Sequence, residues 1–82
     1  MRNKTVLPTP PGASIREQLE FRGMTQREFA TRMDMPEQQI SELMNGKAAL
    51  TRDIALRLES VLGVPASFWL SLEAIYREKL KA

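Results

Sequence analysis

The sequence contains no cysteine and no histidine. The absence of cysteine excludes disulfide bonds and metal sites built on thiolates. The absence of histidine removes the most common metal ligand and the side chain that most often acts as a general base near neutral pH. No glycine-rich phosphate loop, metal-binding motif or nucleophile elbow compensates for them. We therefore expect no catalytic residue, no bound metal and no cofactor, and we do not interpret the chain as an enzyme.

Long apolar runs are missing as well. No segment approaches the roughly 20 apolar residues that a membrane-spanning helix needs, and no apolar run of signal-peptide length follows the N-terminus. We therefore expect a cytoplasmic protein with no membrane partner. A chain of 82 residues is expected to form one domain with a modest core, to whose stability a partner chain often adds. The formal net charge of +2 permits nucleic acid as a partner but is weak support for it.

Proline is concentrated near the N-terminus, where Pro8, Pro10 and Pro11 precede Gly12. Proline blocks helix formation and restricts the residue before it, so residues 1–12 are predicted to form an extended arm. Residues 13–82 are predicted to form one all-α domain. Apolar periodicity, capping residues and glycine stops place five short helices there, at about 13–22, 25–33, 36–44, 52–62 and 66–80.

The segment from residue 25 to residue 47 is the most informative part of the chain. Thr25 and Glu28 have the spacing of a capping box, in which each side chain accepts a hydrogen bond from a free backbone N–H. Ala30 is small enough to let a second helix cross closely, and Ile40 is expected to pack against it. Asp34 lies in the turn between them and tolerates the positive φ that such turns require. This pattern is typical of a helix-turn-helix, although simple helical bundles use similar spacings.

Several segments of the chain resemble the phage-repressor-like (Cro/C1, XRE) helix-turn-helix family. The segments that carry this resemblance are GMTQREFA at 23–30, ISELMNGK at 40–47 and LTRDIALRL at 50–58. Pro11-Gly12, GVPASFWL at 63–70 and Leu72 narrow the resemblance to the HigA/VapI-type antitoxins, which are plasmid maintenance antidotes. The resemblance covers about residues 11–80. It implies a five-helix, lambda-repressor-like fold, dimeric DNA binding, repression of its own operon, and neutralisation of a HigB-type ribonuclease toxin.

The second helix of such a motif enters the major groove of double-stranded DNA, where its first residues and its outward face reach base edges. Gln38 can bond adenine through both ends of its amide, and Ser41 can bond several bases. A two-fold homodimer would place two such helices roughly 34 Å apart, which suits a palindromic operator. The predicted base-reading residues are Glu37, Gln38, Gln39, Ser41 and Glu42.

A second group of residues is predicted to contact the DNA backbone. Gln26, Asn45, Gly46 and Lys47 match positions that touch phosphate in the family that the chain resembles. The other phosphate candidates are Arg27, Arg32 and Arg52. Glu37 and Glu42 depart from the family pattern, because many members carry basic or amide side chains on this helix. Carboxylates near phosphate cost Coulomb energy, although they can accept a bond from cytosine, and both can equally be solvated helix-forming residues.

The last predicted helix carries more apolar side chains than one small core requires. At about 100° per residue, Phe68, Leu72 and Ile75 share one face, and Trp69, Tyr76 and Leu80 share a neighbouring one. We predict that the second set forms part of a dimer interface, since aromatic residues favour interfaces. Phe21 lies off the apolar stripe of the first helix, where it can meet the proline arm or a partner surface.

Three alternatives to the antitoxin function stay open from sequence. The chain can be the DNA-binding module of a general XRE-type regulator. It can be the reader module of a longer helix-turn-helix protein with a metallopeptidase domain, although no His-Glu-x-x-His motif is present here. It can also be a protein-interaction domain that has lost DNA binding, which the acidic residues of the recognition helix would suit.

Overall fold

The computed structural model describes residues 8–81, and five α-helices account for most of them. The predicted all-α fold with five helices is confirmed, and residues 8–81 include no strand. Residues 1–7 of the predicted arm and Ala82 lie outside the described residues. The helices are α1 (Gly12–Arg22), α2 (Gln26–Met33), α3 (Glu37–Met44), α4 (Arg52–Leu62) and α5 (Ala66–Lys81).

Local side-chain chemistry starts two of these helices. The hydroxyl of Thr25 accepts a hydrogen bond from the N–H of Glu28 at 3.0 Å, and the Glu28 carboxylate accepts one from the N–H of Thr25 at 2.8 Å. This is the predicted capping box at the start of α2. Thr51 caps α4 in the same way, since its hydroxyl accepts from the N–H of Ile54 at 3.3 Å. The prediction that α3 begins at Pro36 is corrected by one residue, because Pro36 has an extended ψ of 145° and precedes the helix.

The core forms where the apolar faces of all five helices meet. Ala55 and Leu58 of α4 contribute to its centre, and Trp69 of α5 closes one side of it. Gly12 is buried at the start of α1, where a Cβ atom would overlap the carbonyl group of Met44. The lack of a side chain therefore lets α1 pack directly on the end of α3. The largest fully buried side chains are Ile15, Phe29, Met33, Ile40, Leu58 and Trp69.

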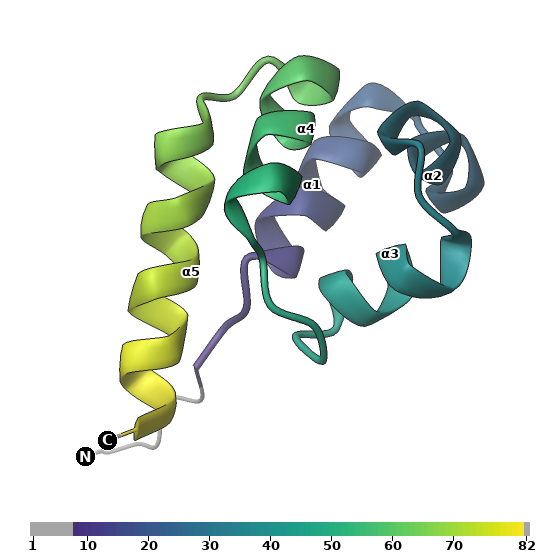
Figure 1. The fold of residues 1–82 in the computed structure, drawn as a ribbon. Helices are drawn as coiled ribbons and strands as arrows, with labels where there is room; N and C mark the ends of the chain where they lie inside the picture. The colour runs from purple at the N-terminus through teal and green to yellow at the C-terminus, as the bar shows by residue number, and fades with distance from the viewer. Residues whose placement is uncertain (1–7, 82) are drawn as a thin grey trace.

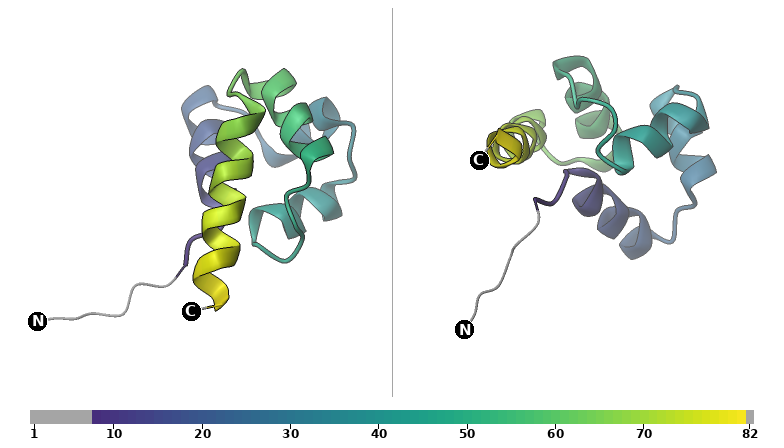
Figure 2. Two further views of the ribbon diagram at one scale, coloured as in Figure 1. Left: turned by 60° about the vertical axis from the view of Figure 1, so that its left-hand side comes forward. Right: turned by 90° about the horizontal axis from the view of Figure 1, so that it is seen from below.

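Helices α1 to α4 form a body along one side of which α5 stands (Figure 1). Helix α5 packs mainly against α4, and its C-terminal end extends beyond the loop that joins α3 to α4 (Figure 1). Seen from below, α5 is at the edge of the molecule, with one side turned away from the other helices (Figure 2). None of the helices within residues 8–81 combines the length and the apolarity that crossing a bilayer requires. The arrangement leaves both α3 and the outer side of α5 open to partners.

Candidate nucleic-acid interface

The turn between α2 and α3 has the geometry that the sequence predicts for a helix-turn-helix. Asp34 has φ 57°, and among residues 8–81 it is the only non-glycine residue with positive φ. The N–H of Met35 donates to the carbonyl of Ala30 at 3.0 Å, which closes the end of α2. Ala30 and Ile40 are both buried where α2 and α3 pack together. The crossing of the two helices is thus fixed by a small residue, an apolar residue and a left-handed turn.

Arg57 of α4 braces this turn, a role that the sequence does not predict. Its Nη1 atom donates to the carbonyl oxygens of Met33 at 2.8 Å and of Asp34 at 3.1 Å. Its Nε atom lies 3.1 Å from a carboxylate oxygen of Asp53, four residues earlier on the same helix. The spacing of Asp53 and Arg57 is visible in the sequence. The two carbonyl acceptors are not, because they lie more than twenty residues away along the chain.

The predicted base-reading residues lie on the outer side of α3. Glu37, Gln38 and Gln39 are exposed, while Ser41 and Glu42 are partly buried. The amide nitrogen of Gln38 donates to the Glu42 carboxylate at 3.4 Å. This contact gives Glu42 a second possible role, that of holding the Gln38 side chain in one orientation. The face is therefore accessible to a groove but carries two negative charges.

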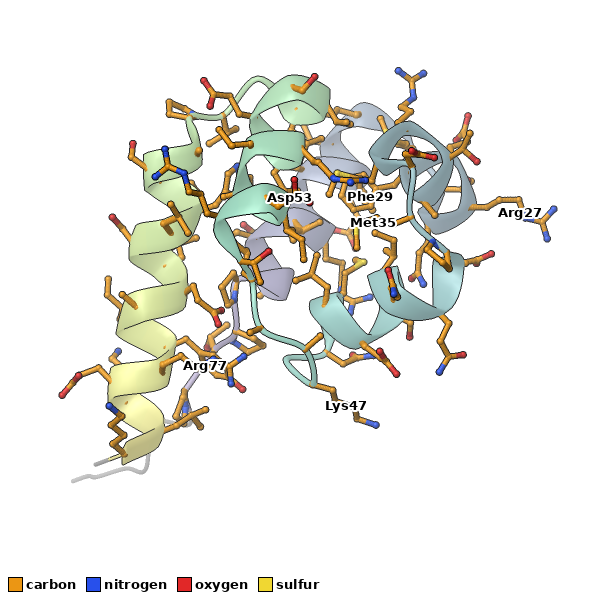
Figure 3. The ribbon with its side chains drawn as sticks, in the orientation of Figure 1. Arg27, Phe29, Met35, Lys47, Asp53 and Arg77 are labelled. Carbon is orange, nitrogen blue, oxygen red and sulfur yellow. The ribbon has the colours of Figure 1, made fainter. Side chains whose placement is uncertain are left out.

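The predicted phosphate contacts flank α3 on both sides along the chain. Arg27, in the first turn of α2, and Lys47, after the end of α3, both project away from the body (Figure 3). Arg32 and Arg52 are exposed as well, and Gln26 is partly buried at the first position of α2. Long cationic side chains in such positions can reach the backbone on either side of a groove.

The loop from Asn45 to Lys47 uses its own backbone donors internally. The N–H groups of Asn45, Gly46 and Lys47 donate to carbonyl oxygens of α3, and the Asn45 side chain donates to the Ser41 carbonyl at 2.9 Å. Lys47 is exposed. If this loop contacts phosphate, the contact therefore depends on the Lys47 side chain more than on backbone N–H groups.

The structure explains why a glycine occupies position 46 in this loop. Its φ of 75° favours glycine, and a Cβ atom here would lie 2.8 Å from the hydroxyl of Tyr76 and 3.1 Å from Pro10. From sequence, Gly46 is predicted to contact the DNA backbone. The structure shows a close approach by α5 and by the segment before α1.

The prediction that Trp69 forms part of a dimer interface is wrong. Trp69 is 0% exposed in the single chain, so it has no surface with which to meet a second copy. Its ring packs in the core, and its indole N–H donates to the carbonyl of Val64 at 3.2 Å. The large apolar residues exposed on α5 are Phe68 and Ile75 on the neighbouring face, and Leu80 near the end of the helix. Phe68 meets Trp69 edge to face, with ring centroids 5.1 Å apart.

The other predicted interface residues lie in three different settings. Tyr76 is partly buried against Gly46. Leu80 is 50% exposed, near the end of α5 that extends past the body (Figure 1). Phe21 is 89% exposed at the C-terminal end of α1 and so does not pack beneath Pro8, Pro10 or Pro11. Its prediction as a partner contact stands as a hypothesis.

One ionisable group near the motif has a clear electrostatic shift. The backbone hydrogen bond from Thr25, supported by the Thr25 side chain, lowers the pKa of Glu28 from its ordinary value of 4.5. Arg32, one turn later, acts in the same direction.

Within residues 8–81, no three carboxylates are grouped so that they could hold a metal ion. The surface around α2 and α3 presents exposed amides and cations together with the carboxylates of Glu28, Asp34 and Glu37.

Comparison with known proteins places these features in a family. A helix-turn-helix family model matches residues 15–69, which span the motif and most of the core. An uncharacterised HTH-type transcriptional regulator of Escherichia coli K12, YddM, is 40% identical over 63 residues, or 77% of this chain and 67% of that protein.

Two solved structures share the whole architecture. The first is an addiction module antidote protein of a HigA family from Coxiella burnetii, with a TM-score of 0.85 and 32% identity over 92% of this chain and 83% of that one. The second is a putative antidote protein of a plasmid maintenance system from Nostoc punctiforme. It also has a TM-score of 0.85 and 32% identity, over 93% of this chain and 84% of that one.

Proposed function

This chain belongs to the helix-turn-helix family of DNA-binding transcriptional regulators, and we propose that it is the antitoxin of a HigBA-type toxin-antitoxin module. In this proposal it binds a palindromic operator as a homodimer, represses its own operon and neutralises a ribonuclease toxin. The family is one of regulators rather than of enzymes. Likeness to two antidote proteins over more than nine-tenths of the chain is the observation that carries the antitoxin role.

The proposed DNA contacts follow from the accessible side of α3. Gln38 reads a base, and Glu37, Gln39, Ser41 and Glu42 lie around it at the groove floor. Lys47 binds phosphate on one side, while Gln26 and Arg27 do so at the start of α2. Arg32 and Arg52 complete the proposed backbone contacts, and Asn45 and Gly46 support the Lys47 contact by shaping its loop. The two glutamates offset part of the attraction from these cations, so we expect specificity to depend on α3 and affinity to depend on Lys47 and the arginines.

The proposed homodimer uses the outer side of α5. We define the α5 apolar face as Phe68, Leu72 and Ile75, which share one side of the helix at four- and three-residue spacing. Phe68 is 44% and Ile75 is 52% exposed, and Leu72 is partly buried between them. A second copy would remove this surface from water and stabilise a small domain. This face replaces the Trp69 interface that the sequence suggests, while Leu80 can extend the contact at the helix end.

Titration against the protein's own promoter tests DNA reading. Fluorescence anisotropy at two salt concentrations should give tight binding to promoter DNA and weaker binding to scrambled duplex, with affinity falling steeply as salt rises. Gln38→Ala should weaken promoter binding by about 5- to 100-fold and scrambled-duplex binding little, because it removes a base contact. Lys47→Ala should weaken binding to both duplexes. It should also reduce the salt slope, which is the slope of the logarithm of the binding constant against the logarithm of the salt concentration, by about 0.9.

Glu20→Ala, on the exposed side of α1, is the control and should change neither affinity nor slope. Equal binding to promoter and scrambled duplex by the unaltered protein would contradict sequence reading. If the protein binds neither duplex, a protein-interaction domain becomes the better interpretation. The acidic residues Glu37 and Glu42 would suit that function.

Coexpression tests the antitoxin role separately from DNA reading. The product of the reading frame next to this gene should arrest growth alone and be harmless when this chain is present. The two proteins should also co-purify. The antitoxin role would be contradicted if this chain did not relieve the growth arrest, or if the adjoining product were not toxic. The chain would then be a general regulator of the same family.

A further inference from the structure

Two neighbouring residues of α5 lie against the loop between α3 and α4. Arg77 points from α5 toward this loop (Figure 3), and its Nη2 atom donates to the carbonyl of Ala48 at 3.4 Å. The Tyr76 hydroxyl occupies the space where Gly46 would carry a Cβ atom. Backbone hydrogen bonds from residues 45–48 tie the loop to α3, those of Lys47 and Ala48 being to the Glu42 carbonyl.

Arg77 is itself held in place by two further contacts. Its Nε atom lies 2.7 Å from a carboxylate oxygen of Glu73, whose side chain is only 12% exposed. Its guanidinium lies 5.0 Å from the centre of the Tyr76 ring. A guanidinium oriented in this way by an ion pair and a ring presents its remaining donors in a fixed direction, here toward the loop.

We propose that Arg77 is a positioning residue for DNA binding, which together with Tyr76 holds residues 45–48 of the loop between α3 and α4 so that Lys47 meets the phosphate backbone. Arg77 acts through the loop and does not touch DNA. The proposal rests on the DNA-binding part of the proposed function and is independent of the antitoxin role.

The positioning role has two alternatives. Arg77 can contact DNA directly, or it can have a purely structural role. The polar contacts of Arg77 are with Glu73, Tyr76 and the Ala48 carbonyl, and 38% of its side chain is exposed. A purely structural arginine would affect the whole domain, whereas a positioning arginine should affect the loop first, because it contacts the loop at one carbonyl.

Amide hydrogen exchange in the protein without DNA gives the first test. Arg77→Met keeps the apolar stem of the side chain and removes its donors. We expect the exchange rates of the Lys47 and Ala48 amides to rise about three- to tenfold, with core amides such as that of Leu58 unchanged. Lys79→Met removes one charge from an exposed position of the same helix and should leave all these rates unchanged. Unchanged exchange in the loop of Arg77→Met would overturn the proposal whether or not the protein binds its promoter.

Arg77→Met leaves the Glu73 carboxylate without its partner and can destabilise the fold for that reason. The paired variant Glu73→Gln with Arg77→Met removes this complication, and the same local rise in exchange is expected. A rise spread evenly over all helices in both variants would overturn the proposal in favour of a structural role.

A double-mutant cycle with Lys47→Ala gives the second test, on any duplex that the protein binds. Arg77→Met should weaken binding about three- to tenfold when Lys47 is present, and less than about twofold when Lys47 is already alanine. Independent losses that multiply, with the salt slope falling by about 0.9 for each variant, would mean that Arg77 contacts phosphate directly and would overturn the proposal.

Discussion

Single side chains that satisfy backbone groups do much to define this small domain. Thr25, Glu28 and Thr51 close the starts of helices, and each acts within three residues along the chain. Such contacts are readable from sequence because their partners are neighbours. Arg57 and Arg77 satisfy carbonyl groups of distant segments, and nothing near them in the sequence identifies those acceptors.

The capping box should give the stability of the protein a dependence on acid pH. The folded-state pKa of Glu28 is lowered below 4.5, so its ionised form is more stable in the folded chain than in the unfolded one. This contribution is fully present above the ordinary pKa and is lost as the pH falls through the lowered folded-state pKa. Glu28→Gln should therefore be less stable than the unaltered protein at neutral pH and equally stable in strong acid.

Urea denaturation at neutral and at acid pH measures this difference through the transition midpoint. Glu20→Gln removes an exposed carboxylate from α1 and should show no comparable pH dependence. A Glu28→Gln penalty of the same size at both pH values would contradict the assignment to the ionised carboxylate.

At the scale of elements, the angle between α2 and α3 decides whether α3 can enter a groove. Ala30 and Ile40 set the distance between the two helices, and Asp34 sets the turn. Helix α4 contributes to the same junction from outside the motif through Arg57. The unit that presents α3 is therefore three helices rather than two.

Removing the Arg57 brace should destabilise this unit. Arg57→Met deletes the hydrogen bonds to the Met33 and Asp34 carbonyls and should lower the free energy of unfolding by about 1–3 kcal/mol. The exposed Asp53 carboxylate is left in water at little cost. Arg52→Met, at an exposed position of the same helix, should cost less than about 0.5 kcal/mol. If the urea midpoints fall equally in both variants, the Arg57 hydrogen bonds to the turn contribute no more to stability than an exposed arginine does.

At the scale of the whole molecule, the two exposed surfaces lie on different elements. Helix α5 stands at the edge of the body (Figure 2), and Phe68 and Ile75 of the α5 apolar face are exposed. The outer side of α3 carries the exposed residues Glu37, Gln38 and Gln39. A dimer through α5 would leave both copies of α3 open, as simultaneous binding to two half-sites requires.

The dimer prediction is tested with a charge on this face. Ile75→Asp should shift the protein from dimer to monomer in sedimentation or light scattering, while its helical circular dichroism is retained. Promoter affinity should fall by at least tenfold, because one half-site replaces two. Leu56→Asp is the matched control, since Leu56 of α4 is similarly exposed, at 48%, but lies off α5. Dissociation by Leu56→Asp with no effect of Ile75→Asp would place the interface elsewhere.

The sequence by itself determined the five helices, the Thr25 and Thr51 caps and the left-handed turn at Asp34. Helix periodicity, capping boxes and positive-φ positions are properties of a few adjacent residues, so they can be read before the chain is folded. The accessible side of α3 was predictable for the same reason, because Ile40, Leu43 and Met44 mark its inner side. What these residues bind remains a prediction.

Only the tertiary structure decided which side of α5 is buried. Phe68 and Trp69 are neighbours on a helix with apolar residues on two adjacent faces, and periodicity cannot choose between them. Packing against α4 selects Trp69, whose larger ring fills the core and whose N–H reaches the Val64 carbonyl. The reach of Arg57 and Arg77 to distant loops was decided in the same way, since it depends on where helices far apart in sequence come to lie.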